Sequence, residues 1–499
     1  MRVLLITPPL YRIIGFYNRY FPFGITLLGT VLEKRGHKVM VYDADYCASP
    51  DSIDYSQMSS RYDVYLKSFK DKNNLIWKEF EKNIKKFNPD VVGISAFTTF
   101  AASVFYTAKL CRKALPKCKI IIGGPHATVK SDEIFEVCPE VDYIIRGEAE
   151  ESMVDLLDSI RSGEANLKSI LGLSWRENGE VLVNKDRFME RDINKFPMPD
   201  RSLLFNEDKM SSEDMGLIMT SRGCPYHCTY CASTKGLSLR GVDEVLQEIV
   251  YVMAKYGTRQ FTLKDDSFTI DKKRVEELCE KIIKMKLRIS WECNTRINLI
   301  DKNLLTLMKK AGCNFIKIGI ESGSARMLKL MKKGITLAQV RRAAKLLHQS
   351  GIHWSGYFMI GVVDETEEDI RKTMDFIREI KPNLVILGVY EPFPGTEMYR
   401  QGIERGLIKD KMSLKDFYTT WPSNYYKVDS RTQNNVISPE RFGKLEEEVT
   451  DFVRRYNMKP KNLWVMIMAK RRVYMVSPKT FIEDVNKFFK YVFGKIKRE

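Results

Sequence analysis

Three cysteines of this 499-residue chain lie within one short stretch, residues 224–231, at a C-x3-C-x2-C spacing. The three are Cys224, Cys228 and Cys231. An apolar run, residues 216–220, precedes them, so the pattern predicts a strand that ends in a tight cysteine loop. Thiolates are the preferred protein ligands of iron–sulfur clusters and of many zinc sites, and the loop therefore predicts a metal centre.

Other uses of three cysteines fit this spacing less well. Disulfides are not expected, because the thiols are too close in sequence to staple a domain and the chain start is too short for a secretory signal. A structural zinc usually takes two ligand pairs separated by a longer spacer, whereas this loop has three ligands and no obvious second pair. Three thiolates on a four-iron cluster leave one iron open for a substrate or cofactor. Buried, unligated cysteines are the structural alternative.

The loop resembles the signature of the radical S-adenosylmethionine (SAM) superfamily, which has this spacing and an aromatic residue before the third cysteine, here Tyr230. The resemblance implies a 4Fe–4S cluster held by the three cysteines, whose free iron binds the amino and carboxylate groups of SAM. It also implies reductive cleavage of SAM to a deoxyadenosyl radical that abstracts hydrogen from carbon. His227 lies inside the loop, but the signature does not require it, and we interpret it as a neighbour.

The region that must position this loop, residues 216–396, alternates strand and helix patterns. Strands are expected at residues 260–264, 289–293, 314–320, 355–360 and 384–389, with helices such as 242–256, 273–285 and 337–350 between them. This order predicts a partial barrel of parallel strands whose chemistry lies at their carboxyl ends.

Polar residues follow these strands, and SAM needs a carboxylate, a cation or hydroxyl, and a flat apolar slot. On the resemblance to the family, the SAM-binding candidates are Tyr230, Asp265, Arg296, Glu321, Ser322 and Gly361. Structural explanations also exist: Asp265 and Asp266 could cap a helix, and Glu321 could pair with Lys317 or Lys264.

Two further features of the strand ends concern the substrate and the family pattern. Asp266, Arg296 and Tyr357 are hypotheses for substrate contacts. The stretch 361–366 departs from the family, since many relatives have a Pro-Gly pair before the Glu-Thr that stands here at Glu365 and Thr366.

The first 160 residues also alternate strands and helices. Strands are expected at residues 3–6, 38–42, 91–95, 119–122 and 141–145, with helices at 23–36 and 101–114. Continuous apolar strands between helices predict an α/β fold with a doubly wound, Rossmann-like parallel sheet, which binds ligands at its carboxyl ends. No G-x-G-x-x-G follows the first strand, so a nicotinamide site is not supported.

These strand ends resemble the cobalamin-binding domain that precedes many radical SAM cores. The resemblance gives seven cobalamin-binding candidates: Thr7, Ser95, Thr98, Gly123, Gly124, His126 and Glu148. The D-x-H-x-x-G motif that supplies a histidine to cobalt is absent, which implies a cobalamin without a protein histidine on the metal. His126 could contact the cofactor or pack within its loop. The structural alternative is that these are ordinary loop residues beside an empty sheet edge.

We predict four segments. Residues 1–160 form the cobalamin-binding domain, 161–209 a hairpin and linker, 210–400 the radical SAM barrel and 401–499 a helical C-terminal cap. The hairpin has Asn178 and Gly179 at its turn, between strands at 173–177 and 180–183. Within the cap, Trp421, Tyr425 and Tyr426 could line a substrate cavity.

Charge is concentrated near the end of the chain. The net charge is +17, and residues 451–499, with 13 basic and 4 acidic residues, contribute +9 of it. Apolar residues between 481 and 496 recur every three or four positions with lysines mostly opposite, which predicts a basic amphipathic helix. This helix could lie on an anionic membrane or dock on its own protein. The longest uncharged run, residues 91–108, predicts strand, loop and helix instead of a transmembrane segment.

These features predict a cytoplasmic, cobalamin-dependent radical SAM enzyme, similar to the group of anaerobic magnesium-protoporphyrin ester cyclases and cobalamin-dependent methyltransferases. The resemblance implies methyl transfer from methylcobalamin to an unactivated carbon, in a small-molecule, lipid or tetrapyrrole substrate, with a flavodoxin- or ferredoxin-type electron donor. The alternatives are cyclisation or oxidation without methyl transfer, methylthiolation of RNA, and a non-enzymatic cluster sensor. Nucleic acid is not an expected partner, because no binding signature accompanies the basic charge.

Overall fold

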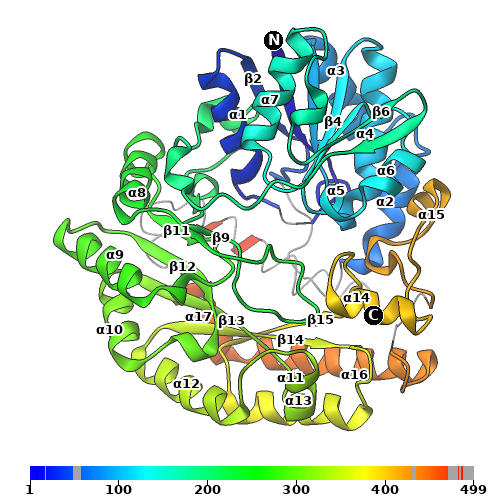
Figure 1. The fold of residues 1–499 in the computed structure, drawn as a ribbon. Coiled ribbons are helices and arrows are strands. Elements are labelled where there is room, and N and C mark those ends of the chain that lie inside the picture. Colours follow the sequence, from blue (N-terminus) through cyan, green and yellow to red (C-terminus); the bar gives the residue numbers. More distant parts are fainter. Residues whose placement is uncertain (17, 49–57, 430–433, 470–480, 483–484, 487–499) are drawn as a thin grey trace. The chain divides into compact units, whose positions relative to one another are not determined.

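The computed structural model describes residues 1–16, 18–48, 58–429, 434–469, 481–482 and 485–486, and the chain divides into two compact units (Figure 1). The first unit contains residues 1–214 and 410–426. The second contains residues 215–409 and the chain from 427 onward.

The first unit is built on a seven-stranded sheet in the order β2-β1-β3-β4-β5-β6-β7. The strands are β1 (Arg2–Thr7), β2 (Lys38–Asp43), β3 (Val91–Ser95), β4 (Lys119–Gly123), β5 (Tyr143–Ile145), β6 (Leu173–Glu177) and β7 (Glu180–Val183). The first five are parallel, as predicted, and their apolar side chains are buried as a parallel sheet covered by helices requires.

The helices of this unit follow the predicted alternation. They are α1 (Phe23–Lys34), α2 (Tyr62–Ser68), α3 (Leu75–Phe87), α4 (Ala101–Ala114), α5 (Pro125–Val129), α6 (Ser131–Val137) and α7 (Glu150–Arg161). Helix α3 shows why they form where they do. The Asn74 side chain caps its first turn, one face buries Trp77, Phe80 and Ile84, and Asn88 ends it in the left-handed conformation.

The hairpin predicted within the linker is confirmed, with Asn178 and Gly179 both at positive φ in its turn. It is not a separate linker, however, because β6 pairs antiparallel with β5 and so extends the first sheet. The pairing satisfies the backbone groups that β5 would otherwise leave open at the sheet edge.

The second unit holds a six-stranded, all-parallel sheet in the order β15-β14-β13-β12-β11-β8. Its strands are β8 (Leu217–Ile218), β11 (Gln260–Leu263), β12 (Ser290–Thr295), β13 (Cys313–Glu321), β14 (His353–Ile360) and β15 (Leu384–Val389). Neighbours in space are neighbours along the chain, which is the topology of the predicted partial barrel. Strand β8 is shorter than the predicted run 216–220, since the chain soon turns into the short pair β9 (Ser221–Arg222) and β10 (Ser238–Leu239).

Helices connect the barrel strands. They are α8 (Val242–Tyr256), α9 (Lys272–Lys284), α10 (Lys302–Lys310), α11 (Ala325–Leu330), α12 (Leu337–Ser350) and α13 (Glu367–Ile380), followed by α14 (Glu397–Glu404). After the barrel come α16 (Pro439–Asn457) and α17 (Pro460–Ala469). Phe442, Leu445 and Val449 of α16 pack with Ile360 and Ile370, so this helix completes the hydrophobic core beside β14 and α13.

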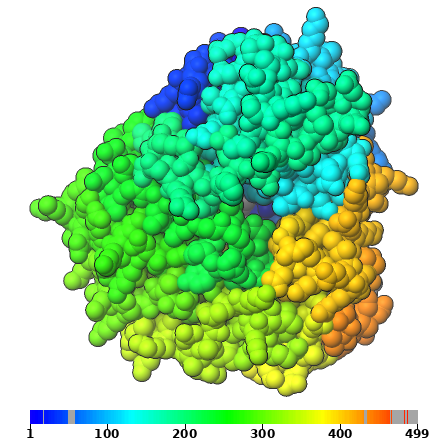
Figure 2. All heavy atoms as spheres, in the orientation of Figure 1, coloured from blue at the N-terminus to red at the C-terminus, as the bar shows by residue number. Residues whose placement is uncertain are grey.

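The predicted C-terminal cap is divided between the two units. Residues 410–426, which include α15 (Leu414–Thr419), belong to the first unit. Glu133 of α6 accepts a hydrogen bond from the Met412 backbone at 3.0 Å, and Phe417 is fully buried against Phe105. In the space-filling view the orange side chains of this segment adjoin the cyan ones of α6 (Figure 2). We call residues 410–426 the returning segment.

The predicted basic helix at the C-terminus lies largely outside the described residues; of it, residues 481–482 and 485–486 are described, and Phe481 and Ile482 are exposed. Within the described chain, no helix is both long and apolar enough to cross a membrane.

Candidate active site

The cysteine loop is closed by its own backbone. The Cys224 N–H donates to the Thr234 carbonyl at 2.9 Å, and the Cys231 N–H donates to the Cys228 carbonyl at 3.2 Å. Gly223, at φ +75°, makes the turn that enters the loop. All three cysteines are free thiols; Cys228 is buried and the other two are partly exposed. The backbone of the loop is thus fixed, while two of its three cysteines remain partly exposed.

The donor set fits a cluster better than a single ion. Among the described residues, no three His, Cys, Asp or Glu side chains are grouped so that they could hold one metal ion. A four-iron cluster does not need such convergence, since each thiolate binds a different iron. Three free thiols in one eight-residue loop, without a fourth, are the set that leaves one iron open.

Asp265, after β11, fixes the start of the cysteine loop. Its buried carboxylate accepts hydrogen bonds from the Thr220 N–H at 2.6 Å and the Ser221 N–H at 3.1 Å, and from the Thr220 hydroxyl. Burial raises the pKa of Asp265. Asp265 does not cap a helix, because the N-cap of α9 is Asp271. Its contact with SAM remains a prediction.

Arg296, at the end of β12, contacts the loop from the other side. Its Nη1 donates to the Cys228 Sγ at 3.5 Å, and its guanidinium carbon lies 3.7 Å from the centre of the Tyr226 ring. Its Nη2 donates to the Lys333 carbonyl. Arg296, a predicted site residue, is 7% exposed. Its guanidinium group is held by a thiol, an aromatic ring and a backbone carbonyl.

Glu321 ends β13 with a positive φ of 75°, an unusual conformation for a glutamate. Its Oε1 accepts a hydrogen bond from the Lys333 Nζ at 2.7 Å, and the same ammonium donates to the Tyr230 hydroxyl at 3.1 Å. Burial and the charge of Glu321 raise the pKa of Tyr230, so the phenol stays protonated. The structural alternative for Glu321 is a pair with Lys317 or Lys264; the structure pairs Glu321 with Lys333, and Lys317 binds Glu292 at 2.6 Å.

Sequence reasoning missed Lys333, which is only 5% exposed and joins Tyr230 to Glu321. Next to Lys332 it reads as part of a solvated lysine run. The available signal was Gly334, at φ +67°, which marks a turn where the chain leaves α11 and folds back.

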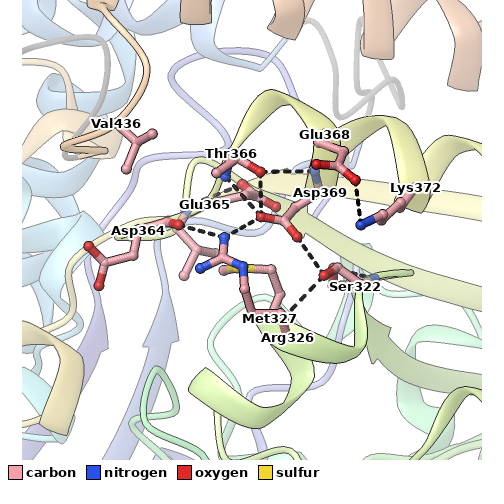
Figure 3. Close-up of polar contacts among 12 residues, drawn as sticks. Ser322, Arg326, Met327, Asp364, Glu365, Thr366, Glu368, Asp369, Lys372 and Val436 are labelled. Carbon is pink, nitrogen blue, oxygen red and sulfur yellow. Dashed lines mark hydrogen bonds and ion pairs between the residues drawn. The ribbon is translucent and has the colours of Figure 1, made fainter.

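The polar residues of Figure 3 form a platform after the ends of β13 and β14, which includes Ser322 after β13 and Glu365 after β14. The Ser322 hydroxyl lies 3.1 Å from that of Thr373, and the Gly361 N–H donates to the Glu365 carboxylate at 2.6 Å. Burial raises the pKa of Glu365 to about 8. In the stretch that departs from the family pattern, Glu365 thus closes the loop.

Asp369 organises the rest of this platform. It caps α13 through a reciprocal pair with Thr366, accepts a hydrogen bond from Ser324 at 2.5 Å, and forms an ion pair with Arg326 (Figure 3). The contacts of Asp369 and Thr373 fix the backbone that follows Glu321, and the Glu365 carboxyl group fixes the backbone that follows Ile360.

In the first unit, the ends of β3 and β4 meet through the backbone. The Ala96 N–H donates to the Gly123 carbonyl at 2.7 Å, and the His126 N–H donates to the Ala96 carbonyl at 3.0 Å. Gly124 has φ +105°, and a Cβ there would lie 2.9 Å from the Ala96 oxygen, so only glycine fits. Backbone and small side chains form this edge.

His126 is fully buried beside this edge. Its Nδ1 lies 3.2 Å from the Thr98 hydroxyl, and its ring meets Phe417 edge to face. Its Nε2 has no hydrogen-bond partner among the described residues. Burial lowers the pKa of His126 to about 3, so the ring is neutral. These contacts fit the packing interpretation of His126 and a cobalamin without a histidine ligand.

Two other candidates flank the same sheet edge. The Thr7 carbonyl accepts a hydrogen bond from Ala44 at 3.1 Å. Glu148, after β5, accepts one from the Glu190 N–H at 2.8 Å. Of the predicted cobalamin residues, the structure brings Thr98 and His126, and Gly123 and Gly124, into direct proximity, whereas Thr7 and Glu148 lie at neighbouring strand ends.

The role predicted for three aromatic residues of the returning segment, in lining a substrate cavity, stays a prediction. Tyr425 and Tyr426 are buried: the first donates to the Phe417 carbonyl at 3.1 Å and the second to Glu133. Trp421 donates to Asp63 at 2.8 Å. The contacts of Trp421 and Tyr426 fasten the segment to the rest of the first unit, and that of Tyr425 lies within the segment.

Comparisons with known proteins identify the class. Residues 218–377 match the Radical SAM superfamily, and residues 12–157 match the B12 binding domain. An uncharacterized methyltransferase of Pyrococcus horikoshii is 31% identical over 417 residues, which are 82% of this chain and 84% of that protein. The chain therefore belongs to the cobalamin-dependent radical SAM family and is an enzyme that uses a 4Fe–4S cluster, SAM and cobalamin.

Further relatives and structures agree. The anaerobic magnesium-protoporphyrin IX monomethyl ester cyclase of Rubrivivax gelatinosus is 27% identical over 69% of this chain, which spans 63% of that protein. The fold matches the radical SAM methyltransferase TsrM from Kitasatospora setae, with a TM-score of 0.64 at 18% identity over 82% of this chain and 77% of TsrM. It also matches the cobalamin-dependent enzyme OxsB, with a TM-score of 0.60 at 18% identity over 90% of this chain and 61% of OxsB. The structural matches confirm the predicted fold class, and the two family matches confirm the predicted cofactors.

Proposed function

We propose that this enzyme transfers a methyl group from cobalamin to an unactivated carbon of its substrate. One observation carries the proposal: the three-thiol loop stands at the mouth of the barrel in a chain that also has a B12-binding domain. The similarity to a relative named as a methyltransferase supports it.

The bound cofactors supply the reactive chemistry, namely a radical that abstracts hydrogen and a methyl group to replace it. The chain supplies position. Cys224, Cys228 and Cys231 would hold the cluster, and Asp265 holds the strand end from which their loop leaves. No side chain is needed as a nucleophile in this proposal.

Of the six predicted SAM residues, contacts with SAM are proposed for Tyr230, Asp265, Glu321, Ser322 and Gly361, and the geometry orders them. Tyr230 and Glu321 are both bonded to the Lys333 ammonium, so they are the strongest candidates. Arg296 is instead held against Cys228. Ser322 and Gly361 would contribute by fixing the backbone near SAM, since the Ser322 hydroxyl lies beside that of Thr373 and the Gly361 N–H is bonded to Glu365. Cobalamin contacts are proposed for the strand ends at Thr7, Ser95, Thr98, Gly123, Gly124, His126 and Glu148.

A second candidate is cyclisation or oxidation without methyl transfer. The relatives named as magnesium-protoporphyrin cyclases favour it, at 27% and 26% identity. The same cysteine loop and the same B12-binding domain would serve both reactions, so product analysis must distinguish them.

The partners follow from the same reasoning. An external reductant is a general need of radical SAM enzymes, and we propose that a flavodoxin- or ferredoxin-type protein supplies the electron. The substrate class is proposed as a small molecule, a lipid or a tetrapyrrole. The charge of +9 on residues 451–499 supports contact with an anionic membrane surface.

The test is anaerobic reconstitution with iron, sulfide and cobalamin, followed by incubation with methyl-labelled SAM and a lipid and metabolite extract. Label in an extracted compound, together with deoxyadenosine, is the expected result. Deoxyadenosine without label in any product would replace methyl transfer by the cyclisation candidate. A reconstituted cluster that does not cleave SAM would overturn both.

A further inference from the structure

We propose that Arg296 sets the reduction potential of the iron–sulfur cluster through its contact with Cys228, as a positioning residue and not as a ligand of SAM. The inference rests on the cluster that family membership implies, and it is independent of whether the product is methylated. The geometry of the guanidinium group points to it.

Arg296 is held on three sides. Nη1 donates to the Cys228 Sγ at 3.5 Å, within the range of an N–H···S hydrogen bond. The planar group stacks 3.7 Å from the centre of the Tyr226 ring, and Nη2 donates to the Lys333 carbonyl. Turning the guanidinium toward another ligand would break all three contacts in a site that leaves the residue 7% exposed.

The neighbouring cation has a different assignment. The Lys333 ammonium is bound to the carboxylate of Glu321 at 2.7 Å, so this pair is close to neutral. Among the described residues, Arg296 contacts a thiol, an aromatic ring and a carbonyl, and none of these groups is a balancing carboxylate. Arg296 therefore brings positive charge directly to a cluster ligand.

Positive charge and hydrogen bonds at ligand sulfurs stabilise the reduced cluster, because reduction adds one negative charge to the cluster and its thiolates. In a buried site this attraction is screened less than at the surface. Arg296 should therefore raise the reduction potential and make the cluster easier to reduce by its electron donor. A residue reserved for the SAM carboxylate would instead affect SAM binding and leave the potential of the SAM-free cluster unchanged.

The experiment measures the cluster itself. The full chain and the variants Arg296→Gln and Arg296→Lys are reconstituted anaerobically, and the reduced cluster is titrated by electron paramagnetic resonance without SAM. At the potential where the parent cluster is half reduced, we expect the ratio of reduced to oxidised cluster to fall at least tenfold in Arg296→Gln, a shift of about 59 mV for one electron. Arg296→Lys, which keeps the charge but loses the stacked N–H···S geometry, should fall in between.

Arg341→Gln is the matched control. It removes an arginine charge from the same unit at a half-exposed ion pair with Glu379, and its titration should overlay the parent's. SAM affinity is measured in parallel with the oxidised cluster. An unchanged potential in both Arg296 variants overturns the proposal, as does an unchanged potential with weakened SAM binding. If Arg296→Gln fails to assemble a cluster, Arg296→Lys alone decides, and a potential equal to the parent's overturns the proposal.

Discussion

In each unit the candidate site lies at the carboxyl ends of a parallel sheet, but the two sites are built from different chemical groups. The barrel site consists of side chains with strong chemistry: three thiols, Arg296, and the ion pair of Lys333 with Glu321. The site of the first unit consists of backbone carbonyls, glycines such as Gly124, and a neutral histidine.

This difference follows from what each site must hold. A cluster carries charge on a few atoms, so it needs charged and hydrogen-bonding groups at fixed places. A corrinoid is a large ligand with a broad surface, and a sheet edge without bulky side chains lets it approach the backbone closely. We therefore expect the barrel site to fail when single side chains change, and the first site to fail when its packing changes.

The largest expected effect is at the cluster. Cys228→Ala removes one of three iron ligands, and we expect iron and sulfide content to collapse and SAM cleavage to fall to background. Cys279→Ala is the control, because Cys279 is also buried but lies within the helical layer at α9. It should cost about 1 kcal/mol of stability and keep the cluster. A cluster of normal content in Cys228→Ala would contradict the assignment.

The next effect tests the first unit through packing. Phe417→Ala empties a fully buried site between Phe105 and Tyr425, at an expected cost of about 3 to 5 kcal/mol. Hydrogen exchange should accelerate in peptides from residues 91–123 and change little in those from 313–360. Phe188→Ala, at an exposed phenylalanine, should leave both regions unchanged. Equal acceleration in both regions would show that the returning segment does not stabilise the first unit selectively.

A smaller effect concerns the pH dependence of the stability of the second unit, which contains Glu365. The pKa of the buried Glu365 is about 8, above its ordinary value of 4.5, so the folded protein keeps a proton that the unfolded chain releases between these pH values. Stability should therefore fall as pH rises through this window, by up to about 1.4 kcal/mol per unit.

Glu365→Gln cannot release that proton. Urea denaturation at pH 6 and pH 8, followed through hydrogen exchange of the barrel, should show the variant gaining on the parent by about 1 to 2 kcal/mol at the higher pH. Glu368→Gln, at an exposed glutamate in the first turn of α13, should follow the parent at both pH values. Parallel curves for Glu365→Gln and the parent would contradict the buried, protonated carboxyl.

The smallest expected effect is at His126. Because the fully buried ring packs against Thr98 and Phe417, His126→Asn should leave the electron paramagnetic resonance spectrum of bound cob(II)alamin unchanged. The asparagine amide can still bond to Thr98. A nitrogen splitting that is present in the parent and absent from the variant would place His126 on cobalt and end the packing interpretation.

The comparison also explains what the sequence could predict. Strands such as β15 and helices such as α4 and α8 were predicted to the residue, because apolar periodicity and caps are local signals. The cysteine triplet was equally accessible, since its spacing is local. Lys333 was missed because its role depends on the distant Glu321 and Tyr230, and an adjacent pair of lysines carries no trace of burial.

The division of the chain was the least accessible feature. Nothing in residues 410–426 marks them as part of the first unit, because their aromatic side chains would suit any hydrophobic surface. The assignment depends on Glu133, which accepts the Met412 N–H and the Tyr426 hydroxyl. Such long-range pairing cannot be read from local composition.

The returning segment also imposes an order on biosynthesis. The ribosome must add 212 residues after Asp214 before Tyr426 exists, and the whole barrel sequence is among them. At ordinary elongation rates of roughly 5 to 20 residues per second this takes about 10 to 40 s. During that interval the nascent first unit carries Phe105 and His126 without Phe417 to cover them. The unit that is translated first can therefore be completed only after the barrel has been made.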